Sequence, residues 1–162
     1  RKEKPIVSEV FINKARACSL TGHRIVNKDL DQKKLNDLFY QLIDKGFDTF
    51  LIGIALGVDT LCFNMLAKIR EQKDIKLIAC IPCEKQDYKF SIKQKQEYQQ
   101  MLSIADEKIY VSKEYNAYCM QKRNRFMVDN SSVLVAYLRQ EKTGTAYTVN
   151  YARKNNVSII NV

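Results

Sequence analysis

The chain alternates short apolar runs with longer segments in which apolar residues recur every three or four positions. The first run covers residues 17–21 and ends at Gly22. Further runs cover residues 48–53, 75–81, 107–112, 132–138 and 157–161. A run of four to eight apolar residues between turn residues is typical of a buried strand. The pattern therefore predicts six strands.

The segments between these runs have the periodicity of helices. One face of the first segment is apolar, with Leu35, Leu38, Phe39, Leu42 and Ile43. Gly46 follows it, where a left-handed helix cap is expected. Helical segments also cover residues 58–72, 91–105, 117–130 and 144–155.

Short apolar strands that alternate with helices of this length indicate a parallel sheet covered on both faces. We therefore predict an α/β fold, a Rossmann-like three-layer sandwich with a mainly parallel sheet of about six strands. The predicted domain covers residues 17–162. Residues 1–16 are left as an N-terminal extension.

Length and hydropathy are compatible with one globular domain. The 162 residues suffice for a hydrophobic core without disulfides or metal. No apolar run approaches the roughly 18 residues of a membrane span, so we expect no membrane partner. The first residues are charged and lack the apolar core of a signal peptide, which predicts a cytoplasmic protein.

The five cysteines favour buried thiols over a metal site. Cys18, Cys62 and Cys80 lie in apolar segments, where free cysteine behaves as a small hydrophobic residue. Cys80 and Cys83 form a C-x-x-C pair, but the chain has no second pair and one histidine. A four-ligand zinc site would need distant ligands, so we predict neither a metal nor a cofactor.

The net charge of +9 favours an anionic partner. Nucleic acid, a phosphorylated small molecule and a merely soluble basic surface all fit such a charge. The lysines are scattered without a compact basic run, which favours the small molecule over nucleic acid.

The predicted strand ends carry the candidate ligand-binding residues. In open parallel sheets, ligands bind at the carboxyl ends of the strands. Glycine turns that open a helix let the backbone approach an anion there. Two such turns occur, "GIALGVDT" and "RQEKTGTAYT". Neither matches the G-x-G-x-x-G or P-loop motif, so ATP hydrolysis is not expected. The candidates are Thr21, Gly22, His23, Arg24, Gly53, Gly57, Asp59, Arg123, Asn124, Gly144, Thr145 and Thr148.

Individual candidates allow more than one interpretation. Arg24 and Arg123 could each grip a phosphate with two hydrogen bonds or form a surface salt bridge. Asp59 could accept a ribose hydroxyl or cap its helix, and Asn124 could contact a base or ribose edge. His23 could be a catalytic base or a pocket wall.

Four segments together resemble the SLOG superfamily, and most closely its YpsA-like branch. They are "SLTGHR", "GIALGVDTLCFNML", "CIPCEKQ" and "KTGTAYTVNYA". The resemblance implies a Rossmann-like domain that binds a nucleotide-like small molecule, and a homo-oligomer. The segment "RNRFMVDNSSVLVAY" is also similar to DprA proteins, which bind single-stranded DNA.

Resemblance to the LOG branch bears on catalysis. LOG enzymes cleave nucleoside monophosphates with an arginine in R-x-x-x-M, a pattern that Arg123 and Met127 fit. The position of their catalytic glutamate is Thr148, which cannot act as a carboxylate. Glu84 and Asp87 would be the fallback acid or base.

The leading hypothesis is a domain that binds a nucleotide or an NAD-derived, ADP-ribose-like ligand, as a sensor or sequestering protein. The first alternative is a nucleotide N-glycosidase of the LOG type. Its catalytic candidates are Arg123, Glu84, Asp87 and His23. The second alternative is a DprA-like binder of single-stranded DNA.

Overall fold

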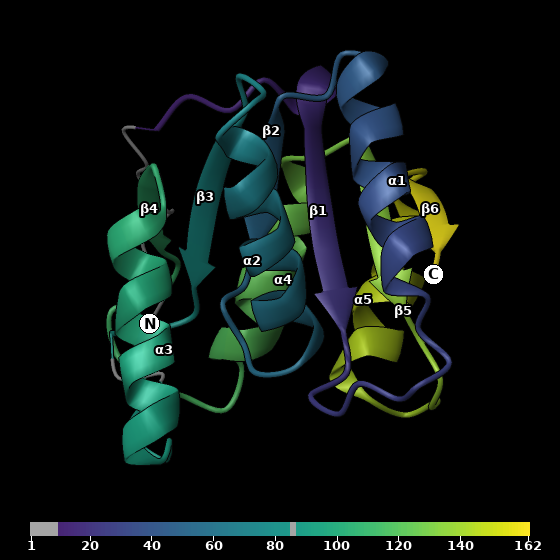
Figure 1. Cartoon of the computed structure of the whole chain (residues 1–162). Coiled ribbons are helices and arrows are strands. Elements are labelled where there is room, and N and C mark those ends of the chain that lie inside the picture. The colour runs from purple at the N-terminus through teal and green to yellow at the C-terminus, as the bar shows by residue number, and fades with distance from the viewer. Residues whose placement is uncertain (1–9, 85–86) are drawn as a thin grey trace.

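Six parallel strands form one sheet in the computed structural model, which describes residues 10–84 and 87–162 (Figure 1). Their order across the sheet is β4-β3-β2-β1-β5-β6. The strands are β1 (Ala17–Gly22), β2 (Thr49–Ile52), β3 (Lys76–Ile81), β4 (Glu107–Tyr110), β5 (Val133–Tyr137) and β6 (Ser158–Asn161). The six predicted strands are confirmed, and every strand pairing is parallel.

Helices cover both faces of the sheet, which confirms the three-layer prediction. On one face lie α1 (Gln32–Asp44), α2 (Val58–Arg70) and α3 (Ile92–Ile104) (Figure 1). On the other face lie α4 (Cys119–Asp129) and α5 (Gly144–Lys154) (Figure 1). A short 3₁₀ helix, Lys14–Arg16, precedes β1.

The strand order explains this division of the helices. From β1 the chain moves outward through β2 and β3 to β4, and it then returns to β5 on the other side of β1. Crossovers between parallel strands are almost always right-handed, so reversing the direction of travel moves the later helices to the opposite face. The loops after β1 and β5 therefore diverge at one edge, where a ligand crevice is expected.

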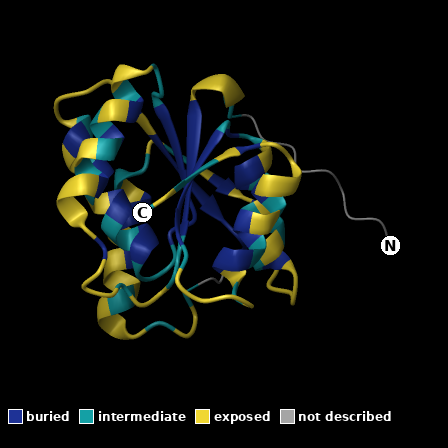
Figure 2. Ribbon diagram, turned by 90° about the vertical axis from the view of Figure 1, so that its right-hand side faces the viewer, coloured by how far each residue is buried: buried dark blue, intermediate teal, exposed yellow. Residues whose placement is uncertain are grey.

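The core lies on both faces of the sheet, and the strands run through its centre (Figure 2). Beneath α1 and α2, the rings of Phe39 and Phe50 meet edge to face at 5.9 Å, and Phe63 is fully buried. The strands read as continuous apolar runs because both of their faces are covered. The outer faces of the helices are largely exposed (Figure 2).

Part of the expected N-terminal extension packs on the domain. Val10 and Ile12 contact the apolar cluster that contains Leu51, Ile78 and Met127. Residues 1–9 lie outside the described residues. The described part of the extension, from residue 10 onward, thus adds to the core.

All five cysteines are buried, including Cys83 and Cys119. Burial raises the pKa of the Cys18 and Cys80 thiols to about 12. Within the described residues, no cluster of three or more histidine, cysteine or acidic side chains could hold a metal ion. No helix in the same part of the chain has the length and hydropathy to cross a membrane.

Among the five glycines, Gly57 has the closest neighbouring backbone at its Cβ position. Its φ is +86°, and a Cβ atom there would lie 2.2 Å from the carbonyl oxygen of Arg24. Gly46 also has a positive φ, +105°, but nothing lies within 4 Å of its Cβ position. Gly144 has neither constraint. Comparing the three glycines therefore distinguishes the cost of a positive φ from the cost of a steric clash.

Alanine substitutions at these three positions should differ in stability. Gly144→Ala should change the free energy of unfolding by less than about 1 kcal/mol, because the position is open. Gly46→Ala should lower it by about 1 kcal/mol through strain alone. Gly57→Ala should lower it by about 3 kcal/mol or more, because strain adds to a clash with rigid backbone. Urea denaturation at constant m-value measures all three. Equal losses of stability at Gly46 and Gly57 would show that the Arg24 backbone shifts easily to accommodate the added Cβ atom.

Candidate functional site

A cavity of about 350 Å³ lies at the carboxyl end of the sheet, where the strand order reverses. The end of β1, the loop after β2, one face of α4 and the start of α5 line it. The predicted ligand-binding residues Thr21, Gly22, His23, Arg24, Gly53, Asp59, Arg123, Asn124, Gly144 and Thr145 all line this cavity. Gly57 and Thr148 are the two predicted residues that do not.

Five further residues of the cavity wall were not predicted. They are Leu20, Ala55, Met120, Met127 and Thr143. Met120 and Met127 stand at helical spacing from Arg123, so the periodicity of α4 could have revealed them. Thr143 caps α5 by accepting a hydrogen bond from the Ala146 N–H, and a threonine before a helix start is a recognisable signal.

His23 joins the loops that follow β1 and β5. Its Nε2 accepts backbone N–H groups from Arg139 at 2.8 Å and Gln140 at 3.2 Å. Burial, and next the charge of Arg139, lower the pKa of His23. The imidazole is therefore neutral with its proton on Nδ1. Nε2 already holds two donors, which leaves the pocket-wall role and not that of a base at this nitrogen.

A polar cluster beside His23 reinforces this junction. The buried Tyr137 hydroxyl donates to Asp29 at 2.8 Å and accepts the Asn27 N–H at 3.2 Å. Arg139 donates to the other oxygen of Asp29 at 2.5 Å and lies 4.2 Å above the Tyr137 ring. These contacts fix the two loops relative to each other.

Gly22 at the end of β1 and Gly57 before α2 let the end of β1 and its loop approach α2. A Cβ atom on Gly22 would lie 2.5 Å from the Cβ of Val58. The Val58 N–H donates to the His23 carbonyl at 3.2 Å. Gly57 supports this contact from outside the cavity wall, so its role here is to pack the β1 loop against the start of α2.

The loop after β2 contains a strained residue. Ile54 is fully buried and has a φ of +56°, a conformation that β-branched residues rarely adopt. Such strain costs about 1–3 kcal/mol and occurs often at functional sites. The distorted turn lets the Ala55 N–H reach the Asp59 carboxylate at 3.1 Å.

Asp59 is a buried carboxylate in the cavity wall. Its residue exposure is 6%, Oδ2 accepts the Ala55 N–H, and Oδ1 has no hydrogen-bond partner. Burial raises the pKa of its carboxyl to about 6, against the opposing effects of Arg123 and the Ala55 N–H. Asp59 does not act as the side-chain cap of α2 in this arrangement, since the cap residue is Gly57.

Arg123 reaches the cavity from α4 and is 5% exposed. Its Nη1 donates to the Gly53 carbonyl at 2.6 Å and to the Cys80 carbonyl at 3.3 Å. Its Nε donates to Asn124 Oδ1 at 2.7 Å. The strand ends thus occupy most of the guanidinium, so the two-bond phosphate grip considered from the sequence is not available in this conformation.

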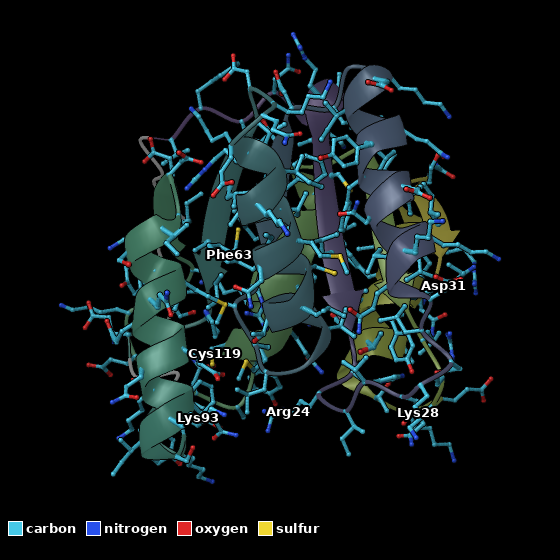
Figure 3. The ribbon with its side chains drawn as sticks, in the orientation of Figure 1. Arg24, Lys28, Asp31, Phe63, Lys93 and Cys119 are labelled. Atoms are coloured by element: carbon cyan, nitrogen blue, oxygen red, sulfur yellow. The ribbon has the colours of Figure 1, made fainter. Side chains whose placement is uncertain are left out.

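The remaining candidate residues lie at the cavity rim or away from the cavity. Arg24 is exposed at the cavity rim, at the carboxyl end of the sheet (Figure 3). Glu84 is exposed and Asp87 partly exposed, and neither lines the cavity. The Thr148 hydroxyl donates to the Gly144 carbonyl within α5 at 2.9 Å. Asp59 is therefore the acidic residue of the described cavity wall.

The sequence model of the YspA SLOG family matches residues 27–159. The SPbeta prophage-derived protein YoqJ of Bacillus subtilis (strain 168), itself uncharacterized, is 37% identical in an alignment over 120 residues. The alignment covers 65% of this chain and 69% of YoqJ.

Two solved structures of DNA processing protein A (DprA) have the same fold. The protein from Streptococcus pneumoniae superposes with a TM-score of 0.67 at 16% identity, over 91% of this chain and 50% of that one. The Helicobacter pylori protein, described in a single-stranded DNA binding mode, has a TM-score of 0.64 at 16% identity, over 91% and 65%. This chain thus spans half to two thirds of those proteins, and the likeness concerns the fold.

The raised pKa of Asp59 predicts how stability depends on pH. Between about pH 4 and pH 6 the folded state keeps a proton that the unfolded state has lost, so the contribution of Asp59 to stability falls as the pH rises. The full loss above pH 6 is about 3 kcal/mol. Asp59→Asn should therefore gain about 3 kcal/mol over the wild type between pH 4 and pH 7. Urea denaturation across this range measures the gain, with the exposed Asp37→Asn as control. Parallel stability curves for Asp59→Asn and the wild type would contradict the buried charge.

Proposed function

The chain belongs to the YspA SLOG family, and on that premise we propose that it binds a nucleotide or an NAD-derived, ADP-ribose-like ligand in the cavity at the carboxyl end of the sheet. In this proposal the protein acts as a sensor of the ligand or sequesters it. The observation that carries the proposal is the position of the cavity, between loops that diverge from β1 and β5. This is where open α/β sheets bind nucleotides.

The chemistry of the cavity rim supports an anionic ligand. Arg24 is exposed there, and Gly144 and Thr145 begin α5, whose amino terminus carries a partial positive charge. No atom lies within 4 Å of the Cβ position of Gly144, so a phosphate can approach the backbone closely. A phosphate between Arg24 and the start of α5 would leave the rest of the ligand inside the cavity.

The size and wall of the cavity favour binding over hydrolysis. Its volume of about 350 Å³ lies at the lower end of the range of about 300–1,000 Å³ for small-molecule sites, which suits one nucleotide unit. Glycosidases of the usual kind need two carboxylates at the scissile bond. Asp59 is the acidic residue in the described wall, and Thr148 is turned back into its helix. The N-glycosidase alternative therefore has less support than a binding function.

Ligand binding can be tested with AMP, NAD, ADP-ribose and cyclic ADP-ribose in thermal-shift and calorimetric titrations. At least one of them should raise the melting temperature and bind with one-to-one stoichiometry. Arg24→Glu should weaken that binding about 10-fold or more, because it removes a charged hydrogen bond to phosphate.

Lys28→Glu is the matched control, since Lys28 is exposed in the same loop and lies outside the cavity wall (Figure 3). It makes the same change in net charge and should alter affinity less than about twofold, as expected for a screened exposed charge. Failure of all four compounds to bind would refute the proposal. Equal losses in both variants would indicate general electrostatic attraction and not a site at the cavity rim.

Single-stranded nucleic acid is a second candidate ligand, favoured by an exposed aromatic and basic surface. The rings of Tyr88 and Tyr115 meet edge to face at 6.1 Å, and the Lys89 ammonium lies 5.4 Å from the Tyr88 ring. Both rings are more than half exposed, and Tyr118 is 71% exposed. Exposed aromatic rings beside cations are how proteins stack single-stranded bases. The DprA of H. pylori binds single-stranded DNA.

Fluorescence anisotropy with a single-stranded thymidine oligonucleotide tests this candidate. If it holds, affinity should fall steeply with salt. Tyr115→Ala should weaken binding about fivefold or more through lost stacking. Phe11→Ala, which removes an exposed aromatic ring elsewhere, should not weaken it. No binding at low salt, or equal effects of the two variants, would eliminate the aromatic surface as a nucleic-acid site.

A further inference from the structure

Asp59 and Arg123 bring opposite charges to one wall of the cavity without forming a salt bridge. A Cβ atom on Gly53 would lie 2.7 Å from Nη1 of Arg123 and 3.0 Å from Oδ2 of Asp59. The two side chains therefore flank Gly53. In the described part of the chain no ion pair within 4 Å joins them. Each is at least nine-tenths buried.

Each side chain keeps unused hydrogen-bonding capacity. Oδ1 of Asp59 has no donor. Nη2 of Arg123 has the Met120 sulfur as its acceptor, at 3.7 Å, and a thioether accepts hydrogen bonds weakly. A buried charged group with an unmade hydrogen bond is costly. Both residues line the cavity, so its wall contains one buried acceptor without a donor and one donor whose acceptor is weak.

The opposite charges of Asp59 and Arg123 restrict which chemical group of a ligand can bind both side chains. A phosphate would pair with Arg123 but would be repelled by Asp59, and an ammonium group would have the opposite conflict. A hydroxyl is neutral, donates one hydrogen bond and accepts others. It therefore supplies both the donor that Asp59 Oδ1 lacks and the acceptor that Arg123 Nη2 lacks.

We propose that Asp59 and Arg123 bind a sugar hydroxyl of the ligand, so that the cavity selects ribonucleotides against deoxyribonucleotides. This inference rests on the proposed function, because it places the sugar of a nucleotide in the cavity. The phosphate lies at Arg24 and the start of α5. The 2′- and 3′-hydroxyls of a nucleotide are closer to its 5′-phosphate than the hydrogen-bonding edge of the base is. In a cavity of about 350 Å³ we therefore expect a hydroxyl, and not a base edge, at Asp59.

The same selection excludes the interior of a DNA strand from the cavity. A deoxynucleotide within a strand has no 2′-hydroxyl, and its 3′-oxygen is esterified. Neither position can donate a hydrogen bond to Asp59. DNA that bound this protein would have to use another surface, such as the exposed tyrosines Tyr88 and Tyr115.

Calorimetric titration of the wild-type protein with AMP, 2′-deoxy-AMP, 3′-deoxy-AMP and inosine monophosphate tests the inference. Removing the bound hydroxyl leaves two buried charged groups without their partner, so at least one deoxy analogue should bind about 10- to 100-fold more weakly than AMP. Inosine monophosphate changes the base edge alone and should bind within about threefold of AMP.

Asp59→Asn should abolish most of the difference between AMP and the weaker deoxy analogue, because the amide is a neutral and weaker hydrogen-bonding partner than the carboxylate. Asp37→Asn makes the same change at an exposed position of α1 and should leave the difference intact. The comparison of analogues on the wild-type protein needs no variant, so it decides the question independently of how Asp59→Asn behaves.

The possible results separate this inference from the proposed function. If AMP and both deoxy analogues bind with equal affinity, hydroxyl recognition is overturned and nucleotide binding stands. A loss with inosine monophosphate alone would place the base edge at Asp59 and would also overturn the inference. If AMP, NAD, ADP-ribose and cyclic ADP-ribose all fail to bind, the proposed function fails and hydroxyl recognition fails with it.

Discussion

The buried guanidinium of Arg123 holds the carboxyl edge of the sheet together. It extends from α4 on one face and donates to the carbonyl groups at the ends of β2 and β3, Gly53 and Cys80. Strand-end carbonyls in a buried edge need donors, and a buried cation needs acceptors. The hydrogen bonds between the guanidinium and the two carbonyl groups meet both requirements. Gly53 has no side chain because the guanidinium occupies the space where its Cβ would lie.

This arrangement leaves a polar but incompletely satisfied wall. Asp59 places a negative charge close to Arg123, but one of its oxygens accepts the hydrogen bond of the Ala55 N–H. A direct salt bridge would have closed the wall and left little for a ligand to contact. The strained conformation of Ile54 and the partner-less oxygen of Asp59 both destabilise the empty fold. Such local costs are typical of sites shaped for binding and not for stability.

A different set of contacts holds the loops after β1 and β5 together. His23, Asp29 and Tyr137 connect the loop after β1 to the loop after β5 through hydrogen bonds and ring contacts. The close packing of Gly57 against the backbone of Arg24 fixes the first loop to α2 as well. Under the proposed function, a ligand would meet a preformed entrance, which would lower the entropic cost of binding. Arg24 itself remains exposed at the rim, free to turn toward an anion.

The sequence by itself determined the six strands, the five helices and the edge at which the polar residues gather. Those features depend on periodicity and on turn residues within a few positions, so the local sequence is sufficient to predict them. The sequence also named ten residues of the cavity wall, because the ends of parallel strands must meet at one edge. It could not decide what each side chain does there. The tautomer of His23 follows from Arg139, 116 residues away, and the engagement of Arg123 follows from Gly53, 70 residues away. Glu84 and Asp87 are carboxylates after β3, and Thr148 lies in the first turns of α5, yet none of the three lines the cavity. Only the tertiary structure settles such questions, because hydrogen-bond partners and burial are properties of contacts between distant segments.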